Sequence, residues 1–568
     1  MRHKSISRFA PAALLLVATL AVANPFRPAV AQQQSPQAYV ELRAAADSLA
    51  RHGEASEAAQ AYRRLLEANP NDDRLWTAYA GYAWRAGERE EAAGALERVV
   101  ELGTDQRSRV MVRIAGMYAE LGETERAYAW LERALEDRVE TRPNIAGMRQ
   151  FEPYADDPRF RELAGTIDAG EERVAGWRAD LAWLVSEVKR LHADPRRAAH
   201  GPAFDAATLD LAARIPELDD EAITLELQRL VVLLGDGHSG VWSRPTPRAL
   251  FASLPIDFYW FSDGIFVTGG VGSAAGRVGQ QLVSIGGLPA ATLLERTEPF
   301  ISRDNPMGIR AGAPRLLNRM AVLRELGASY GLDSADVELR VADGTTGTVT
   351  LHAGARREGW RLRPPSGTAP PGPRWLQSDT NLRMEEIGPG IVYVLYSGVA
   401  NPEGSTVAAF ADSLYRELTE RNATAVVVDV RRNGGGNNFL NWPLVRTLIR
   451  FEADEPGRKI YMLVGRHTFS AAQNFSNWVN RLTDAVFVGE PTGSAANFTG
   501  ETTRVNLPYS GLTVSVSSRY WQDSHATDTR IWIAPDLPVP LDSRSYFGNR
   551  DPVIEATLWL IERERTAS

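Results

Sequence analysis

The sequence predicts a multidomain α+β protein in which an α-helical repeat array precedes a mixed region that ends in a layered α/β core. Three observations predict it: a glycine that recurs at nearly constant spacing, short strand-like segments in the middle, and strands alternating with helices towards the C-terminus. A length of 568 residues also exceeds that of a typical single domain. Hydrophobic residues make up 44% and charged residues 24%, which excludes a disordered or collagen-like chain.

The use of cysteine and lysine excludes several kinds of site. The chain contains no cysteine, which excludes disulfides, thiolate metal sites and a cysteine nucleophile. The only lysines are Lys4, Lys189 and Lys459, and neither of the last two is well placed to form a Ser–Lys catalytic pair. A net charge of −8 argues against a nucleic-acid partner.

Residues 1–31 are predicted to form an export signal. Basic residues precede an apolar run at 10–23 that is too short to span a bilayer comfortably. Ala29-Val30-Ala31 fits a cleavage site, with Ala21-Val22-Ala23 as a second candidate, and an uncleaved anchor is the alternative. No later run reaches transmembrane length. We therefore expect an exported protein, periplasmic or extracellular, with no stable membrane span after cleavage.

A helical repeat follows the signal. Gly53, Gly87 and Gly122 each end a helix-like stretch, and each is followed by an alanine five positions later and a bulky residue nine positions later. This segment resembles three tetratricopeptide repeats, and we place the domain at 32–166; an irregular helical bundle is the alternative. The resemblance implies a groove for a peptide or protein, so we expect a possible protein partner at the repeats.

The middle of the chain is predicted to contain a helical segment, a small β module and a linker. The helical segment covers 170–245, and its second helix is stopped by Gly235. Residues 246–356 form the β module, in which Gly279–Gly287 resembles part of a PDZ-like fold, although another kind of β-barrel would give similar residues. A Pro- and Gly-rich linker follows at 357–376. The expected strands of the module are 256–260, 265–268, 282–285, 337–341 and 348–352.

Residues 377–568 are predicted to form the α/β core. The segment Thr424–Val430 is a continuous apolar run, as expected for a buried parallel strand. Further strands are expected at 391–396, 460–464 and 485–489, with helices at 405–421, 438–450 and 470–482. This succession of strands and helices predicts a layered sheet.

Two loops at the carboxyl ends of these strands are candidate sites, because open α/β sheets bind ligands there. One loop contains Gly434, Gly435 and Gly436, whose N–H groups could hold a negatively charged oxygen; a flexible turn is the alternative. The other contains Ser470 at the start of a helix, where the Ala471 N–H points towards any oxyanion formed on attack. An ordinary helix cap at Ser470 is the alternative.

A nucleophilic serine requires a base, and His238 is the best-placed histidine. It lies on a glycine-flanked loop beyond the end of a helix, whereas His467 is only three residues before Ser470 and would tend to point away. A merely solvated histidine is the alternative.

Residues 171–568 resemble the S41 family of serine peptidases, which includes the C-terminal processing and tricorn-core proteases. Five segments in the family's order carry the resemblance: Gly235-Asp236-Gly237-His238-Ser239, Asp429 to Gly436, Thr468-Phe469-Ser470-Ala471-Ala472, Gly489-Glu490-Pro491-Thr492-Gly493 and Ala534-Pro535-Asp536-Leu537. The resemblance implies a ClpP/crotonase-like core and requires no metal or other cofactor.

The resemblance also assigns roles in the site. It implies Ser470 as nucleophile and His238 as base, with an oxyanion hole made by Ala471 and by Gly434 or Gly435. The family's Ser–Lys branch is excluded because residues 493–497 contain no lysine. In the histidine-dependent branch a serine precedes the base, but here Gly237 stands there, and Asp528 takes the place of a glutamate. The group that orients His238 could therefore be Ser239, Asp236 or Asp528.

These observations predict an exported serine peptidase that hydrolyses peptide bonds of a peptide or protein substrate through a Ser470 acyl-enzyme. The rival hypothesis is a non-catalytic peptide- or ligand-binding scaffold with a degenerate protease-like domain, which the absent orienting serine favours. Acyl-CoA chemistry on a crotonase-like core is disfavoured by the export signal.

Overall fold

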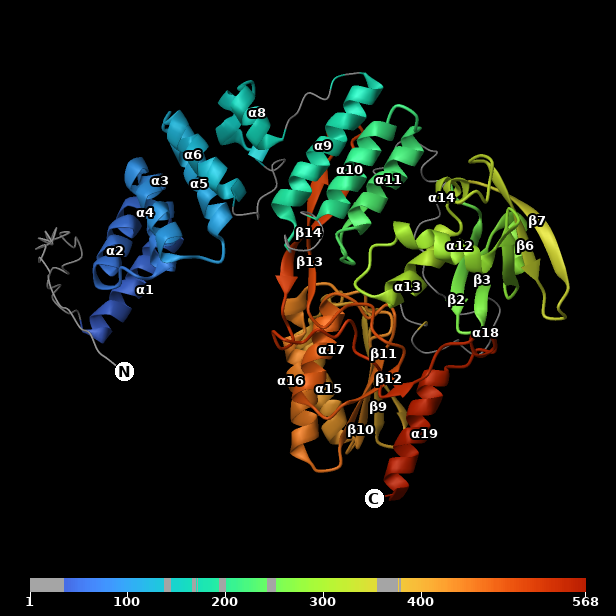
Figure 1. The fold of residues 1–568 in the computed structure, drawn as a ribbon. Helices are drawn as coiled ribbons and strands as arrows, with labels where there is room; N and C mark the ends of the chain where they lie inside the picture. Colours follow the sequence, from blue (N-terminus) through green and yellow to red (C-terminus); the bar gives the residue numbers. More distant parts are fainter. Residues whose placement is uncertain are drawn as a thin grey trace, which may run out of the picture. The chain divides into compact units, whose positions relative to one another are not determined.

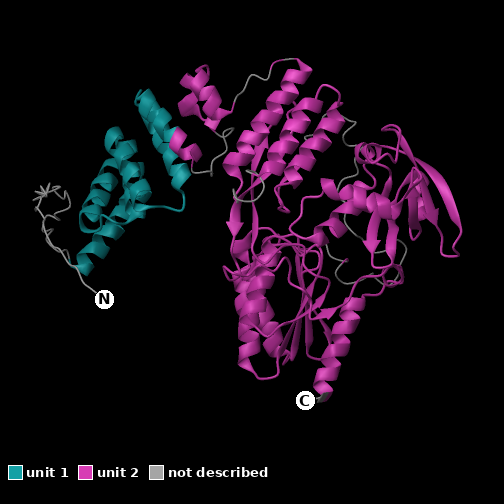
Figure 2. Ribbon diagram, viewed as in Figure 1, with its two compact units in different colours: residues 1–131 teal, residues 132–568 magenta. Residues whose placement is uncertain are grey.

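The protein was analysed as a computed structural model. The structure describes residues 35–136, 145–165, 170, 172–193, 201–242, 252–354, 376 and 380–567. It separates into two compact units, residues 1–131 and 132–568 (Figure 2). The units divide within helix α6 (Thr124–Glu136), before the boundary at 166 that the sequence suggested for the repeat domain. The export signal at 1–31 and nearly all of the linker at 357–376 lie outside the described residues.

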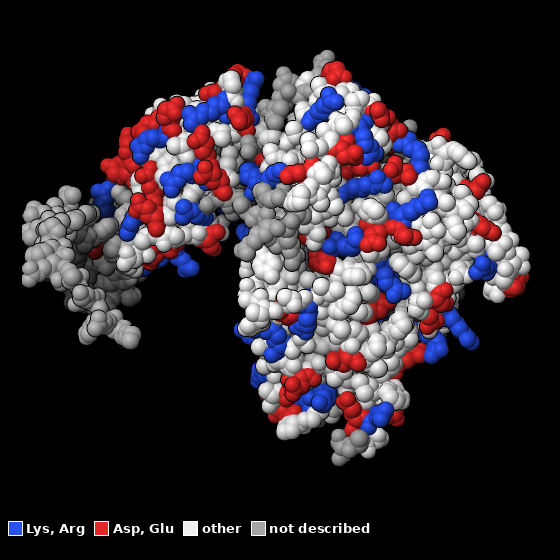
Figure 3. Space-filling view, in the orientation of Figure 1, with Lys and Arg blue, Asp and Glu red and all other residues white. Residues whose placement is uncertain are grey.

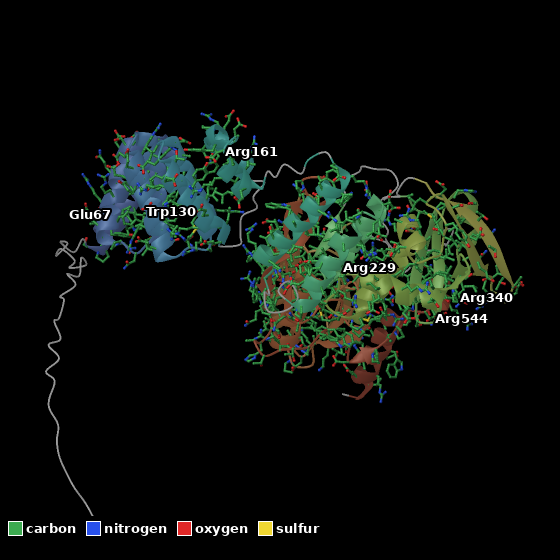
Figure 4. The ribbon with its side chains drawn as sticks, turned by 45° about the horizontal axis from the view of Figure 1, so that its top comes forward. Glu67, Trp130, Arg161, Arg229, Arg340 and Arg544 are labelled. Carbon is green, nitrogen blue, oxygen red and sulfur yellow. The ribbon has the colours of Figure 1, made fainter. Side chains whose placement is uncertain are left out.

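The first unit contains paired antiparallel helices, as the repeat predicted. Gly53 and Gly87 end α1 and α3 in the left-handed conformation, with φ of 80° and 91°, which a glycine adopts without strain. The repeated alanines Ala58 and Ala92 are fully buried and allow adjacent helices to approach closely, whereas Glu67 lies on the exposed side of α2 (Figure 4). The helices before α6 are α1 (Pro36–His52), α2 (Ala55–Ala68), α3 (Asp73–Ala86), α4 (Arg89–Leu102) and α5 (Arg107–Glu120) (Figure 1).

The second unit is built on a six-stranded sheet in the order β15-β12-β11-β10-β9-β8. Its pairs are parallel except for β8 with β9. All five residues of β10 are buried, as the apolar run predicted. The strands are β8 (Leu382–Gly388), β9 (Ile391–Tyr396), β10 (Ala425–Asp429), β11 (Lys459–Val464), β12 (Val486–Gly489) and β15 (Leu537–Pro538).

Both faces of this sheet are covered. Alternate residues of a strand point to opposite faces, so Val426 and Val428 pack in one apolar cluster while Val427 packs in another. The first cluster includes residues of α15 (Val407–Glu420), α16 (Trp442–Asp454) and α17 (Ala471–Leu482). The second includes residues of the C-terminal helix α19 (Pro552–Ala567) and of β2 (Ile256–Phe261). The strand–helix succession predicted for the core is therefore confirmed.

A second, three-stranded sheet was not predicted from the sequence. Its order is β1-β14-β13, and β14 pairs with β1 in antiparallel register, Gly240 opposite Ser515. It packs against three helices in one apolar cluster. Because β1 begins two residues after His238, this pairing brings the His238 loop to the β13–β14 hairpin. The elements are α9 (Arg173–Leu191), α10 (Pro202–Arg214), α11 (Asp220–Val232), β1 (Gly240–Trp242), β13 (Phe498–Asn506) and β14 (Thr513–Trp521).

The β module contains an antiparallel sheet in the order β2-β3-β4-β6-β7, and these strands match the five predicted ones. Arg229 of α11 (Figure 4) links the module to the helical segment. Its guanidinium lies 3.3 Å from a carboxylate oxygen of Glu325 and 4.5 Å from the ring centre of Phe300. Other module elements are β3 (Gly264–Gly270), β4 (Gln281–Ile285), α12 (Ala290–Thr297), α13 (Pro306–Leu316), α14 (Met320–Glu325), β6 (Ser334–Arg340) and β7 (Thr346–His352).

The surface carries charges of both signs. Acidic and basic side chains are interspersed over the faces of the units drawn in Figure 3. In the part of the chain that the structure describes, no helix combines the length and apolar character needed to cross a membrane.

We predict that Asp180→Ala lowers the free energy of unfolding by about 1–3 kcal/mol. Asp180 of α9 is buried and accepts the backbone N–H groups of Tyr509 and Ser510 in the β13–β14 turn, so its removal leaves these donors unpaired. Chemical denaturation measures the change. Asp205→Ala, which removes an exposed ion pair with Lys189, should change stability by less than about 0.5 kcal/mol; equal effects would contradict the prediction.

Candidate active site

Ser470 lies at a strained turn between β11 and α17. Its φ of 56° and ψ of −127° are rare for a residue with a side chain. Its side chain makes no capping hydrogen bond to the helix, so the hydroxyl is not serving as an ordinary cap. A strand–turn–helix serine in this conformation is the arrangement that exposes a nucleophile.

The predicted glycine loop lies directly against Ser470. A Cβ atom on Gly435 would stand 2.6 Å from the Ser470 Cβ and 2.9 Å from the Ala471 nitrogen, and Gly435 has a φ of +101°. The Gly435 N–H donates to the Asn433 side-chain oxygen at 3.0 Å. Among the described residues, no protein acceptor takes the N–H of Gly434 or Ala471. Those two groups are therefore the better candidates for an oxyanion hole, and Gly435 provides space.

Buried polar contacts hold this loop. Arg431 pairs with Asp429 at 2.6 Å and with Asp551 at 2.8 Å, and all three charges lie away from water. Asn433 donates from its side chain to the Tyr396 carbonyl and accepts the Phe469 N–H with its own carbonyl. Asn433 thus ties the glycine loop to the residue before Ser470, a role that its sequence position beside the glycines did not reveal.

The structure brings His238 to this site. The His238 ring stacks between the rings of Phe469 and Phe498, with centroid distances of 4.4 Å and 5.3 Å. Since Phe469 precedes Ser470, this stacking brings the segment that carries His238 to the segment that carries Ser470. Neither ring nitrogen makes a hydrogen bond of normal geometry with the described residues, so His238 is not hydrogen-bonded to Ser470 in this structure.

Burial sets the protonation state of His238. It lowers the pKa of His238 to about 4, although the Asp236 charge and the Thr499 carbonyl oppose the shift. The imidazole is therefore neutral at pH 7, which is the form that a general base requires.

Asp236 fixes the His238 loop without touching the ring. It accepts the backbone N–H groups of His238 and Ser239 at 2.8 Å and 2.7 Å, and also the hydroxyls of Ser239 and Ser517. His192 lies 3.1 Å away on the same carboxylate. Burial would raise the pKa of Asp236, but these hydrogen bonds hold it below its usual value. Two of the candidate orienting groups, Asp236 and Ser239, therefore hold the backbone and do not reach the imidazole.

The structure does not bring Asp528 to His238. The Asp528 carboxylate pairs with Arg530 at 2.8 Å and accepts the Ser524 hydroxyl. The hydrogen bond from Arg530 is the main reason why the pKa of Asp528 lies below its usual value. Its proposed orienting role therefore has no supporting contact, because local partners occupy the carboxylate.

A second acid, which the sequence did not single out, lies beside the His238 loop. Asp304 of the β module accepts the Gly237 N–H at 2.7 Å. Burial raises the pKa of Asp304 to about 7, although the Gly237 hydrogen bond acts in the opposite direction. No local motif marks Asp304, because its contact with Gly237 depends on how the module packs on the core.

A cavity of about 680 Å³ opens at this place, and Gly237, Gly434, Gly435 and Phe469 are among the residues lining it. It is large enough for part of a peptide. Within the described ranges, no three His, Asp or Glu side chains gather in a way that could hold a metal ion.

Comparisons with known proteins agree with this architecture. A tetratricopeptide repeat family model matches residues 40–82, and curated proteins give no match. The fold is similar to that of mature CPAF complexed with lactacystin, at 15% identity and a TM-score of 0.50, over 68% of this chain and 98% of that one. A second mature CPAF structure gives 15% identity and a TM-score of 0.50, over 69% and 98%. A photosystem II D1 C-terminal processing protease gives 16% identity and a TM-score of 0.31, over 65% and 93%.

The chain has a segment that matches the tetratricopeptide repeat model and a fold similar to that of mature CPAF. The predicted fold class is confirmed. At 15% identity the likeness concerns the fold alone, so any role of an individual residue rests on the geometry of the site.

We predict that Gly435→Ala slows the reaction of Ser470 with a fluorophosphonate probe by about 10²–10³-fold, the usual cost of damaging an oxyanion hole. The added Cβ would collide with Ser470. Gly457→Ala is the matched control. Gly457 likewise has a positive φ, of +90°, but a Cβ on it would contact nothing within 4 Å. Labelling rates and thermal unfolding are measured for both; similar labelling rates in the two variants would contradict the prediction.

Proposed function

We propose that this protein is a serine peptidase that hydrolyses peptide bonds through an acyl-enzyme on Ser470, with His238 as general base. The observation that carries the proposal is the strained, uncapped Ser470 turn beside a buried histidine. The resemblance of residues 171–568 to the S41 serine peptidases supports the same reaction class.

The proposed reaction has two halves. Neutral His238 takes the Ser470 proton as the hydroxyl attacks the carbonyl carbon, and the N–H groups of Gly434 and Ala471 stabilise the resulting oxyanion. The imidazolium then gives its proton to the leaving amine. Water, activated by His238, hydrolyses the ester and regenerates Ser470. The missing Ser470–His238 hydrogen bond would form when substrate fills the cavity.

A non-catalytic peptide-binding scaffold is the second candidate, and one observation favours it. Neither ring nitrogen of His238 makes a hydrogen bond of normal geometry with the described residues, as would be expected if the pair no longer served catalysis. Covalent reaction at Ser470 separates the two candidates, since a pure binder leaves the hydroxyl unreactive.

We also propose that the protein is exported to the periplasm or the extracellular space and that the repeats bind a protein or peptide. The first proposal rests on the sequence of residues 1–31. The second rests on the tetratricopeptide match at 40–82.

Ser470→Ala should abolish peptide cleavage and phosphonate labelling while leaving the thermal unfolding temperature within a few degrees of wild type. Ser476→Ala is the matched control, because Ser476 is buried in the same helix and its hydroxyl donates only to the Ala472 carbonyl. That variant should retain activity. Cleavage by Ser470→Ala at the wild-type rate would refute the proposed nucleophile.

The acid limb of kcat/KM should lie near pH 4, because His238 is active only when neutral and burial lowers its pKa to about 4. Phe498→Ala removes one face of the aromatic sandwich and admits water, so the limb should move upward towards the ordinary histidine pKa of 6.5. The pH dependence of a fluorogenic peptide assay measures both. A limb that stays in place in Phe498→Ala would show that His238 burial does not control it.

A further inference from the structure

Asp304 holds the loop that carries His238. It lies just before α13 in the β module, and its Oδ1 accepts the N–H of Gly237, the residue before His238, at 2.7 Å. A Cβ on Gly237 would lie 2.9 Å from the Phe469 ring and 3.1 Å from Asp304 Oδ1. The carboxyl and the ring therefore occupy the space that a side chain at position 237 would need.

Ser494 lies near Asp304 and contacts the backbone of Ser470. The Ser470 N–H donates to the hydroxyl oxygen of Ser494 at 3.2 Å. The Ser494 hydroxyl and the Ala495 N–H lie near the Asp304 carboxyl and favour its charged form, although Oδ2 accepts no hydrogen bond of normal geometry. Ser494 thus stands between Asp304 and the backbone of Ser470.

Asp304 is held rigidly by its neighbour. The Asn305 side chain donates to the carbonyls of Thr492 and Ile531 at 3.0 Å and 2.6 Å, and its oxygen accepts the Met307 N–H. Asn305 is buried. These bonds clamp the module loop onto the segment that carries Ser494, so the position of Asp304 is fixed relative to both loops of the site.

We propose that Asp304 is a positioning residue that fixes the His238 loop relative to Ser470. This inference rests on the proposed peptidase function. Asp304 acts through the Gly237 N–H on one side and through Ser494 on the other. Without it, the backbone before His238 loses its acceptor, and a small shift of the ring away from Ser470 slows proton transfer more than it weakens substrate binding.

Two substitutions at Asp304 differ in whether the hydrogen bond to Gly237 survives. Asp304→Asn keeps an oxygen that can accept the Gly237 N–H, whereas Asp304→Leu has a similar branched shape, a larger volume and no acceptor. We expect Asp304→Leu to lower kcat by about ten- to a hundredfold with KM within about twofold, since a misplaced catalytic group costs up to about 10² in rate. Asp304→Asn should retain kcat within about threefold. Asp336→Leu, which replaces an exposed acid on β6 of the same module, is the control and should match wild type.

Ser494→Ala tests the second contact with a smaller structural change, and it keeps the proposal falsifiable if Asp304→Leu fails to fold. It should lower kcat, with little change in KM, because the Ser470 N–H loses its acceptor. Unchanged kcat in Ser494→Ala, unchanged kcat in a folded Asp304→Leu, or equal losses in Asp304→Leu and Asp304→Asn would each overturn the proposal.

Wild-type protein treated with a fluorophosphonate probe distinguishes failure of this inference from failure of the proposed function. If the wild-type protein neither cleaves peptides nor is labelled at Ser470, both the proposed peptidase function and the positioning role of Asp304 are wrong. If wild type labels, and Asp304→Leu labels at the same rate, only the positioning role of Asp304 is wrong.

Discussion

The candidate site depends on one backbone constraint, the positive φ of Ser470. Such a conformation costs about 1–3 kcal/mol and persists only where the surroundings enforce it. Here Thr468 is fully buried and donates its hydroxyl to the Val430 carbonyl, while the Phe469 N–H donates to the Asn433 carbonyl. The glycine loop therefore does two things: it leaves space beside Ser470, and it holds the residues that force the turn.

The histidine is held by a different physical principle. Its backbone is fixed by a buried carboxylate, Asp236, whose charge is stabilised by several hydrogen bonds. Its ring lies between two aromatic rings that supply no hydrogen-bond partner. Burial favours the neutral imidazole and outweighs the opposing effects of the Asp236 charge and the Thr499 carbonyl on the pKa of His238. The site thus keeps His238 neutral at pH 7, which is the form that the proposed general base requires.

The sequence predicted the parts of the fold that have a local signature. The repeated glycines predicted the helix pairs of the first unit, and continuous apolar runs such as 424–430 predicted the parallel strands. The β13–β14 hairpin was missed, because its residues alternate only irregularly between buried and exposed positions, although Pro508 and the Ser510-Gly511 pair mark the turn between the strands. Within the site, the resemblance predicted that the Ser470 and His238 segments come together, and His238 stacks on Phe469; it left the orienting group open. Asp528 has the expected spacing, yet Arg530 is two residues away and engages it locally.

Asp304 shows why such a group escapes sequence reasoning. It belongs to the β module, which the sequence predicts to be a domain separate from the α/β core. In the structure the module is joined to the core by packing, since Tyr259 and Phe261 of β2 lie in the same apolar cluster as Val427 of β10. It is also joined by the Asn305 clamp next to Ser494. Packing and hydrogen bonds therefore fix Asp304 of the module against the loops of the candidate site. The module thus contributes to the geometry of that site.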